Sequence, residues 1–158
     1  MTRILMVCMG NICRSPIAEA VLHHQAQAAG ILAQLHIDSA GTHGHYHAGE
    51  APDPRAMAAA AQRSYTQIFG QRARPVKPDD FEQFDLIVAM DRDNLANLTR
   101  MCPAEQQAKL RLLLAYASEL GVQEVPDPYY GNLGGFERVL DLCEAGVRGL
   151  LRHCLQTR

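Results

Sequence analysis

Cys8 and Arg14 are separated by five residues in segment 8–15 (CMGNICRS), and this spacing can support chemistry on a phosphate group. A loop of this size can wrap around a tetrahedral dianion, with backbone N–H groups turned inward and the N-terminus of a following helix adding positive potential. The Arg14 guanidinium is a planar fork that suits two phosphate oxygens. The same surroundings favour a thiolate, so the pattern predicts that Cys8 attacks phosphorus.

A phosphate ester also needs an acid that protonates its leaving oxygen, and two Asp-Pro pairs compete for this role. Asp53 precedes a segment with strong helix propensity, so a role as helix N-cap accounts for it. Asp127 lies in a turn-rich loop, and Pro128 stiffens the exit from that loop. We therefore expect Asp127 to be the general acid.

The elements that position these residues follow from hydrophobic patterning. Segment 3–7 is expected to be a buried strand that leads into the loop, where Gly10 and Asn11 tolerate positive φ. A helix then starts with Ser15 as N-cap and stops at Gly30. Further strands are expected over residues 35–40, 85–90 and 110–114, and further helices over residues 54–63, 91–101 and 136–155. This alternation predicts a parallel sheet with helices on both faces, in one domain over residues 1–158.

The composition narrows the function classes. The chain has 158 residues, a net charge of −2 and 47% hydrophobic residues, which argues against a disordered chain and against a nucleic-acid binder with a basic face. No apolar run is long enough to span a bilayer. Five cysteines at irregular spacing speak against a secreted disulfide scaffold, so we expect a cytoplasmic protein. Cys102, Cys143 and Cys154 are expected to be core thiols.

The segment V-C-M-G-N-I-C-R-S-P resembles the signature of the low-molecular-weight protein tyrosine phosphatases, and other landmarks of that family follow in order along the chain. These are Asp38-Ser39-Ala40-Gly41-Thr42, Pro52-Asp53-Pro54-Arg55, Asp79-Asp80-Phe81, Asp85-Leu86-Ile87, Ala89-Met90-Asp91 and Asp127-Pro128-Tyr129-Tyr130-Gly131.

The resemblance implies an α/β three-layer sandwich with a central four-stranded parallel sheet and the phosphate loop between the first strand and the first helix. It implies hydrolysis of phosphotyrosine in proteins through a cysteinyl-phosphate, without metal or other cofactor. A tyrosine-phosphorylated protein is the expected partner, a cognate bacterial tyrosine kinase being one candidate, and a monomer is expected. The residues expected to bind phosphate are Met9, Gly10, Asn11, Ile12, Cys13, Arg14 and Ser15.

The resemblance also assigns supporting roles. Asn11 and Ser39 are expected to brace the loop, and Gln71 stands where many relatives have a histidine that supports the asparagine. The substrate slot is expected to be formed by Ile12, Tyr46, Tyr129 and Tyr130, with Tyr46 in place of the tryptophan usual in the family. Relatives that act on phosphoarginine carry threonine at the position of Ile12, so this residue favours phosphotyrosine. Ser15 has two candidate roles, as helix N-cap and as hydrogen-bond donor to the Cys8 sulfur.

Several alternatives stay open at this point. Cys8 and Cys13 could form a reversible disulfide, or Cys13 could be a buried thiol. The alternating His43, His45 and His47 could suggest a metal site, but a solvated polar loop is favoured. An arsenate reductase of the same fold would need relay cysteines, and none lies between Cys13 and Cys102. A non-catalytic phosphoprotein-binding module would not need both Cys8 and Asp127.

Overall fold

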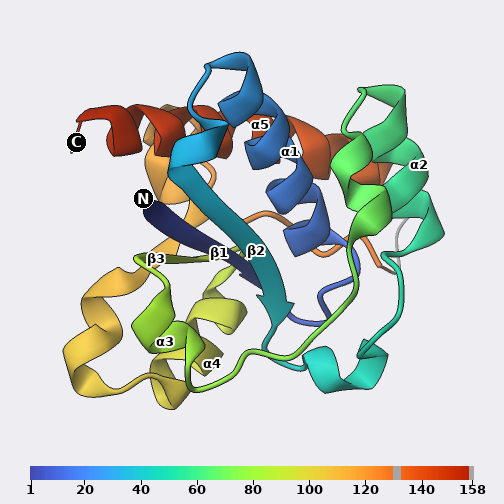
Figure 1. Cartoon of the computed structure of the whole chain (residues 1–158). Coiled ribbons are helices and arrows are strands. Elements are labelled where there is room, and N and C mark those ends of the chain that lie inside the picture. The colour runs from blue at the N-terminus through green and yellow to red at the C-terminus, as the bar shows by residue number, and fades with distance from the viewer. Residues whose placement is uncertain (130–132, 157–158) are drawn as a thin grey trace.

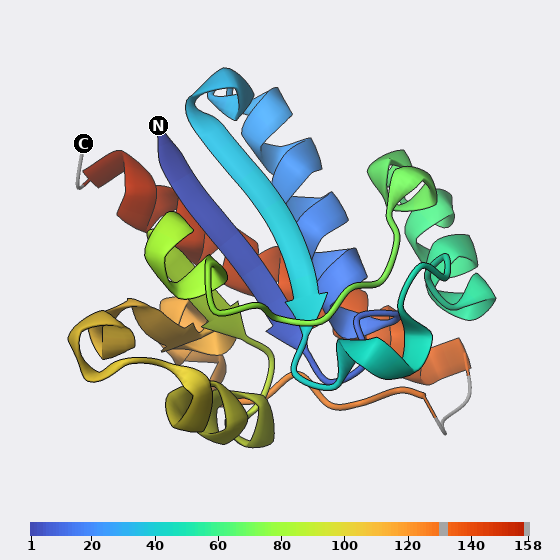
Figure 2. The same cartoon turned by 60° about the horizontal axis from the view of Figure 1, so that its bottom comes forward.

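The fold is built on a four-stranded parallel sheet. The computed structural model describes residues 1–129 and 133–156 (Figures 1 and 2). Its strands are β1 (Thr2–Cys8), β2 (Leu35–Gly41), β3 (Leu86–Ala89) and β4 (Leu110–Leu112), in the spatial order β2-β1-β3-β4. All strand pairs are parallel, with Cys8 opposite Gly41 and Val7 opposite Ala89. The predicted four-stranded parallel sheet is confirmed.

Helices cover both faces of the sheet and make three layers. Helices α1 (Arg14–Ala28), α2 (Pro54–Gln62) and α5 (Leu133–Gln156) lie on one side, and α3 (Asp80–Gln83) and α4 (Arg92–Met101) lie on the other (Figure 1). Successive side chains of a strand point to opposite faces. Ile4 and Met6 of β1 therefore pack in the larger cluster under α1 and α5, whereas Leu5 and Val7 pack in the smaller cluster under α3 and α4.

The first helix begins differently from the expectation. Residue Cys13 precedes α1, and Ser15 is the second residue inside the helix, so the prediction of Ser15 as N-cap is wrong. The physical reason is that the Ser15 hydroxyl is engaged by the loop before the helix rather than by the first turn. The end of the helix agrees with the prediction, because Gly30 adopts φ +76°, a left-handed conformation that glycine tolerates.

The remaining elements differ mainly at their ends. Strands β3 and β4 are shorter than expected, and α5 begins three residues earlier than expected. Asp53 caps α2 as predicted, since its Oδ1 accepts a hydrogen bond of 2.8 Å from the Arg55 backbone N–H. The four-residue α3 was not predicted because one helical turn has no hydrophobic periodicity to recognise.

Close packing against α5 completes the larger core. A Cβ atom on Gly149 would lie 1.8 Å from the carbonyl oxygen of Tyr116, so only glycine allows α5 to lie this close to the 3₁₀ segment Leu113–Leu120. Cys102, Cys143 and Cys154 are buried, as expected for core thiols.

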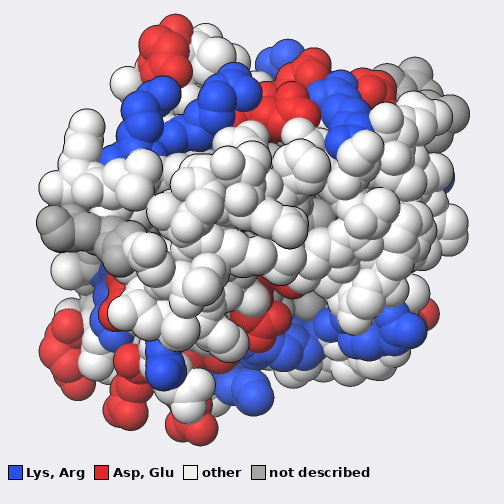
Figure 3. All heavy atoms as spheres, turned by 45° about the horizontal axis from the view of Figure 1, so that its top comes forward, with Lys and Arg blue, Asp and Glu red and all other residues white. Residues whose placement is uncertain are grey.

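The surface mixes charges of both signs. On the face shown in Figure 3, basic and acidic side chains gather together at two opposite margins, with a broad band of uncharged residues between them. Helix α1 adds little charge to the surface, because its Arg14 and Glu19 are buried. Within the described part of the chain, no helix combines the length and apolar character that a membrane span requires.

Candidate active site

The segment between β1 and α1 forms a loop with open backbone amides. Asn11 adopts φ +59°, a conformation that asparagine tolerates better than most residues, whereas Gly10 does not have positive φ. In the described residues, no acceptor takes a hydrogen bond from the N–H groups of residues 9–13. Because α1 starts directly afterwards, its positive end also faces the loop. These features make the loop suited to an anion.

The carbonyl side of the loop is held by a neighbouring segment. The N–H groups of Thr42 and His43 donate to the carbonyl oxygens of Cys8 and Met9, at 2.9 and 2.8 Å. A hydrogen bond of 2.8 Å to the Ile12 carbonyl comes from the N–H of residue 53. These three carbonyl oxygens are thus paired with protein donors, whereas the loop amides are available to a ligand.

Arg14 is fixed beside this loop although its charge is buried. Its Nη1 lies 2.5 Å from Asp91 Oδ2 and donates to the carbonyl oxygen of Val125 at 3.0 Å, and its Nη2 lies 3.7 Å from Asp127 Oδ2. Burial lowers the pKa of Arg14, but Cys8, Asp91 and Asp127 outweigh burial and raise it. Arg14 therefore stays charged and oriented. Asp91 was not predicted as a site residue, although its place directly after β3 is where ligands of parallel sheets bind.

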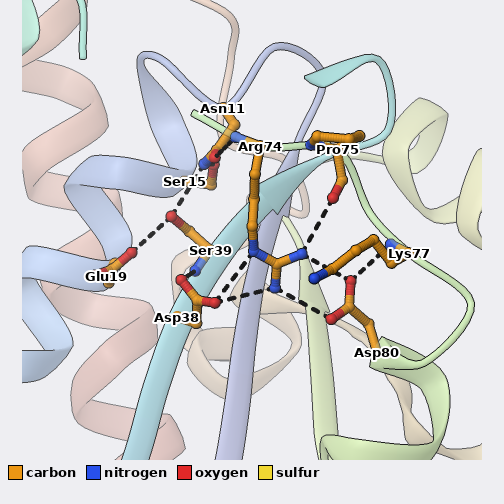
Figure 4. A network of polar contacts seen from close by, with 9 residues as sticks. All are labelled: Asn11, Ser15, Glu19, Asp38, Ser39, Arg74, Pro75, Lys77 and Asp80. Carbon is orange, nitrogen blue, oxygen red and sulfur yellow. Dashed lines mark hydrogen bonds and ion pairs between the residues drawn. The ribbon is translucent and has the colours of Figure 1, made fainter. Parts of the chain in front are cut away.

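A hydrogen-bond network fixes which way the Ser15 hydroxyl points (Figure 4). The backbone N–H of Arg74 donates to Asn11 Oδ1 at 3.0 Å, so the Asn11 amide nitrogen faces the two serines. It donates to Ser15 Oγ at 2.8 Å and to Ser39 Oγ at 3.0 Å. Because Ser15 Oγ accepts from Asn11, its own hydrogen is available to Cys8 Sγ, which lies 3.0 Å away. The contacts expected for Asn11, Ser39 and Ser15 are therefore present.

Glu19 closes the network on the side of α1. Ser39 Oγ donates to Glu19 Oε1 at 2.6 Å, and Gln67 Nε2 donates to Glu19 Oε2 at 2.6 Å. Burial raises the pKa of Glu19 to about 7, against the opposing hydrogen bonds from Ser39 and Gln67. The sequence contained no signal for this role, because an acidic residue in the second turn of a helix is unremarkable by itself.

Arg74 anchors the other end of the network (Figure 4). Its guanidinium contacts Asp38 Oδ2 at 3.0 Å and both carboxylate oxygens of Asp80 at 3.0 and 3.1 Å. Asp38 Oδ1 also accepts from the N–H of Ser39 at 2.8 Å. These ion pairs hold the backbone of Arg74 where its N–H reaches Asn11.

Gln71 makes no hydrogen bond to Asn11 in the described residues, so the expectation that it braces Asn11 directly is wrong. Its Nε2 donates to the carbonyl oxygen of Pro16 at 3.0 Å and to Gln67 Oε1 at 2.7 Å, and its Oε1 is buried without a partner in the described residues. The reason is geometric: Ser15, Ser39 and the Arg74 N–H already surround the Asn11 amide. Gln71 instead holds the first turn of α1 and, through Gln67, orients Glu19.

The two candidate acids have different surroundings. Asp53 caps α2 and makes a two-point ion pair with Arg55. It does not line the hollow, which is the pocket beside the loop of residues 8–14. Asp127 lines that hollow, its side chain is 39% exposed, and its Oδ1 accepts from the N–H of Tyr129 at 3.0 Å. Only Asp127 can therefore approach a ligand seated in the loop.

The hollow has a volume of about 160 Å³, and its walls differ partly from the expectation. Ile12 and Tyr129 line it as expected. Tyr46 does not line it, since the residue is 72% exposed and its ring packs against His45 with ring centroids 4.2 Å apart. His47 lines it instead, with Nδ1 2.7 Å from a Glu50 carboxylate oxygen. No sequence signal separated His47 from the neighbouring histidines.

The predicted wall residue Tyr130 lies outside the described residues. Of the other predicted loop residues, Met9, Gly10, Cys13 and Arg14 also line the hollow with Cys8 at its base. Burial is the main cause that raises the pKa of Cys13, with Asp53, Cys8 and Asp127 adding to it. Cys13 is thus held as a neutral thiol beside the nucleophile candidate.

Known proteins are similar to this chain in both sequence and fold. The chain matches a family model described as low molecular weight phosphotyrosine protein phosphatase over residues 3–158. A low molecular weight protein-tyrosine-phosphatase from Streptomyces coelicolor is 44% identical over 152 residues, which cover 94% of this chain and 91% of that protein. A crystal structure of protein tyrosine phosphatase from Entamoeba histolytica with Hepes in the active site superposes with a TM-score of 0.95 at 38% identity, covering 99% of both chains.

The structure of YfkJ from Bacillus subtilis superposes with a TM-score of 0.91 at 35% identity, covering 100% of this chain and 97% of that one. The match in sequence and in fold extends over nearly the whole of each chain. The chain therefore belongs to the low molecular weight phosphotyrosine protein phosphatase family.

Proposed function

We propose that this protein is a protein tyrosine phosphatase that hydrolyses phosphotyrosine in proteins, and small aryl phosphates, through a cysteinyl-phosphate intermediate. One observation carries the proposal. Cys8 and Arg14 from the loop and Asp127 from a distant part of the chain line one hollow, next to loop amides that have no partner in the described residues. This set supplies a nucleophile, an anion clamp and an acid around the place where a phosphate would lie.

In the first step, the Cys8 thiolate attacks phosphorus. An S–P bond forms as the P–O bond to the phenol breaks, and Asp127 donates its proton to the departing oxygen. Arg14 and the loop amides hold the equatorial oxygens throughout, and this electrostatic contribution is the largest that the site offers. Arg14 needs no rearrangement for this task, since Asp91 and Val125 already hold it.

In the second step, Asp127 accepts a proton from a water molecule that attacks phosphorus. The S–P bond breaks, phosphate is released and the thiolate is restored. The hydrogen bond that Ser15 directs to Cys8 Sγ stabilises the sulfur as a leaving group. Every proton in this cycle moves between water, substrate and Asp127.

The substrate class follows from the shape of the hollow. Tyr129 and Ile12 offer apolar surface to an aromatic ring above the loop. Phosphotyrosine is longer than phosphoserine, so it can reach the loop from the rim while its ring contacts these walls. A tyrosine-phosphorylated protein is the proposed partner, with a cognate bacterial tyrosine kinase as one candidate.

We also propose that residues 1–158 act as a single domain, as a monomer and in the cytoplasm. Two apolar clusters pack on opposite faces of one sheet, which supports a single folding unit. All five cysteines lie in the described residues and none of them is in a disulfide, as in proteins of reducing compartments.

The test is hydrolysis of phenyl phosphate, the ester of a weakly acidic phenol that needs a proton to depart, at mildly acidic pH without added metal. Cys8→Ser is expected to abolish activity, and Asp127→Ala to reduce it by roughly 10²–10⁴-fold. Cys102→Ser is a matched control that should retain activity, because Cys102 lies in the other apolar cluster, away from the hollow. An active Cys8→Ser protein would contradict the mechanism. If Cys8→Ser is inactive as expected, trapping of tyrosine-phosphorylated proteins from a lysate by this variant will identify the physiological substrate.

A further inference from the structure

The segment that carries Asp127 has no helix or strand of its own between residues 122 and 128. Its upstream side is fixed at the buried Val125, whose N–H donates to the Met90 carbonyl at 2.9 Å and whose carbonyl accepts from Arg14. Downstream, Asp127 Oδ1 accepts from the N–H of Tyr129. The position of the Asp127 carboxylate therefore depends on what holds Tyr129.

Arg55 reaches across from α2 to hold Tyr129. Its Nη2 donates to the Tyr129 carbonyl oxygen at 2.7 Å, and its guanidinium carbon lies 5.8 Å from the centroid of the Tyr129 ring. The same guanidinium lies 5.1 Å from the centroid of the Phe136 ring, which is fully buried in α5. Arg55 thus connects the downstream side of the Asp127 segment to two helices, and it does not itself line the hollow.

Asp53 orients Arg55 before any ligand arrives. Asp53 Oδ1 accepts from Arg55 Nε at 3.1 Å and Oδ2 accepts from Arg55 Nη2 at 3.0 Å, a two-point geometry that fixes the guanidinium plane. Burial raises the pKa of Asp53, but the hydrogen bonds from Arg55 outweigh burial and lower it. The backbone N–H of Asp53 also donates to the Ile12 carbonyl oxygen at 2.8 Å.

Asp53 and Arg55 together therefore contact both halves of the site. One contact is to the phosphate loop through Ile12, and the other is to the segment of the acid through Tyr129. We propose that Arg55, oriented by Asp53, is a positioning residue that sets the distance between Asp127 and a phosphate ester bound in the loop. This inference rests on the proposed function, since it assigns how the proton donor of that reaction is held.

The experiment varies the leaving group. Rates kcat/KM are measured for aryl phosphates whose phenols range from strongly acidic nitrophenols, which need no proton to depart, to weakly acidic alkylphenols, which do. Displacement of a catalytic group by about 1 Å can lower the reaction rate on the order of 10²-fold. Arg55→Ala is therefore expected to slow the hydrolysis of the alkylphenol esters by roughly 10–100-fold. Hydrolysis of the nitrophenol esters should slow by no more than about 3-fold, because only proton transfer to the leaving oxygen is affected.

Arg55→Lys keeps the charge but loses the planar fork, and it should shift the leaving-group dependence in the same direction by a smaller amount. This variant keeps the test decisive if Arg55→Ala folds poorly. Competitive inhibition by inorganic phosphate should be unchanged in both variants, because the loop residues are untouched.

Arg63→Ala is the matched control. Arg63 also joins α2 to α5, through Glu137, Asp141 and Glu144, and among the described residues it makes no ion pair with the Asp127 segment. Its replacement should lower stability and leave the leaving-group dependence as in the wild type. The positioning role is overturned if Arg55→Ala slows all esters equally, or if Arg63→Ala changes the dependence as much as Arg55→Ala.

Failure of the proposed function would look different. In that case the wild-type protein would hydrolyse none of the esters, or Cys8→Ser would remain active. If the wild type is active and Asp127→Ala steepens the leaving-group dependence, an unchanged dependence in Arg55→Ala refutes only the role of Arg55.

Discussion

Replacing Glu19 with glutamine should change how the stability of the protein depends on pH. Glu19 is 5% exposed, and burial raises its pKa from an ordinary value of 4.5 to about 7. Asp38 raises the pKa further, whereas hydrogen bonds from Ser39 and Gln67 and the charge of Arg74 lower it. These are the polar and charged groups that act on the carboxyl from the neighbouring elements.

The sign of the effect follows from proton binding. Between pH 4.5 and about 7, folded Glu19 binds a proton more readily than unfolded Glu19, so the free energy of unfolding falls as the pH rises. The stabilising contribution is complete below pH 4.5 and is lost as the pH rises through about 7. At roughly 1.4 kcal/mol per pH unit, the whole change is about 3 kcal/mol. Glutamine stays neutral, so the Glu19→Gln variant lacks this dependence.

The assay is urea unfolding of wild type and Glu19→Gln at pH 5 and pH 8. The free energy of unfolding of the wild type, minus that of the variant, should fall by about 2–3 kcal/mol between these pH values. Glu105→Gln is the control, because Glu105 is exposed, and its difference from the wild type should stay constant. If wild type and Glu19→Gln lose stability in parallel from pH 5 to pH 8, the reasoning about Glu19 is refuted.

Three further predictions concern packing, the sulfur and oxidation. Gly149→Ala should lower the free energy of unfolding by about 3 kcal/mol or more, measured in urea, because its Cβ would lie 1.8 Å from the Tyr116 carbonyl oxygen; a change below about 1 kcal/mol would contradict this close packing. Ser15→Ala should lower kcat by roughly 10–100-fold because the hydrogen bond to Cys8 Sγ is lost. It should leave phosphate inhibition unchanged, since Ser39 and the Arg74 N–H still hold Asn11 after its bond to Ser15 is lost; equal loss of both would point to collapse of the loop. Hydrogen peroxide oxidises the Cys8 thiolate to a sulfenic acid, and Cys13 should then displace water from it to form a disulfide that added thiol reduces. After peroxide and added thiol, Cys13→Ser should therefore recover less activity than wild type, and equal recovery would reject the disulfide.

Much of the fold and the chemical core of the site could be predicted from local sequence. The strand that ends at Cys8 and the helix that begins at Arg14 have clear hydrophobic patterns, and residues 8–15 contain all the residues expected to bind phosphate. Asp127 was separable from Asp53 because the helix after Asp53 explains that residue by capping alone. Signals of this kind are short-range, so they survive in the sequence without knowledge of the tertiary structure.

The residues that hold the core of the site were decided only by tertiary structure. Arg14 meets Asp91 across 77 positions of sequence, and Asn11 meets the N–H of Arg74 across 63 positions. Tyr46 and His47 are adjacent in sequence, yet only His47 lines the hollow, because the 3₁₀ turn Gly44–His47 directs their side chains differently.

The sequence by itself thus indicated which groups are proposed to react, because a candidate nucleophile, anion clamp and acid are recognisable by residue type and local context. Tertiary structure decided how these groups are oriented. It set the direction of the hydrogen bonds around Asn11, the ion pairs of Arg14 and the hydrogen bond from Arg55 to the Tyr129 carbonyl oxygen. The physical reason is that hydrogen bonds and ion pairs depend on distances of a few ångström between side chains from separate elements. Those distances are set only when β1, α1, α2 and the Asp127 segment pack together.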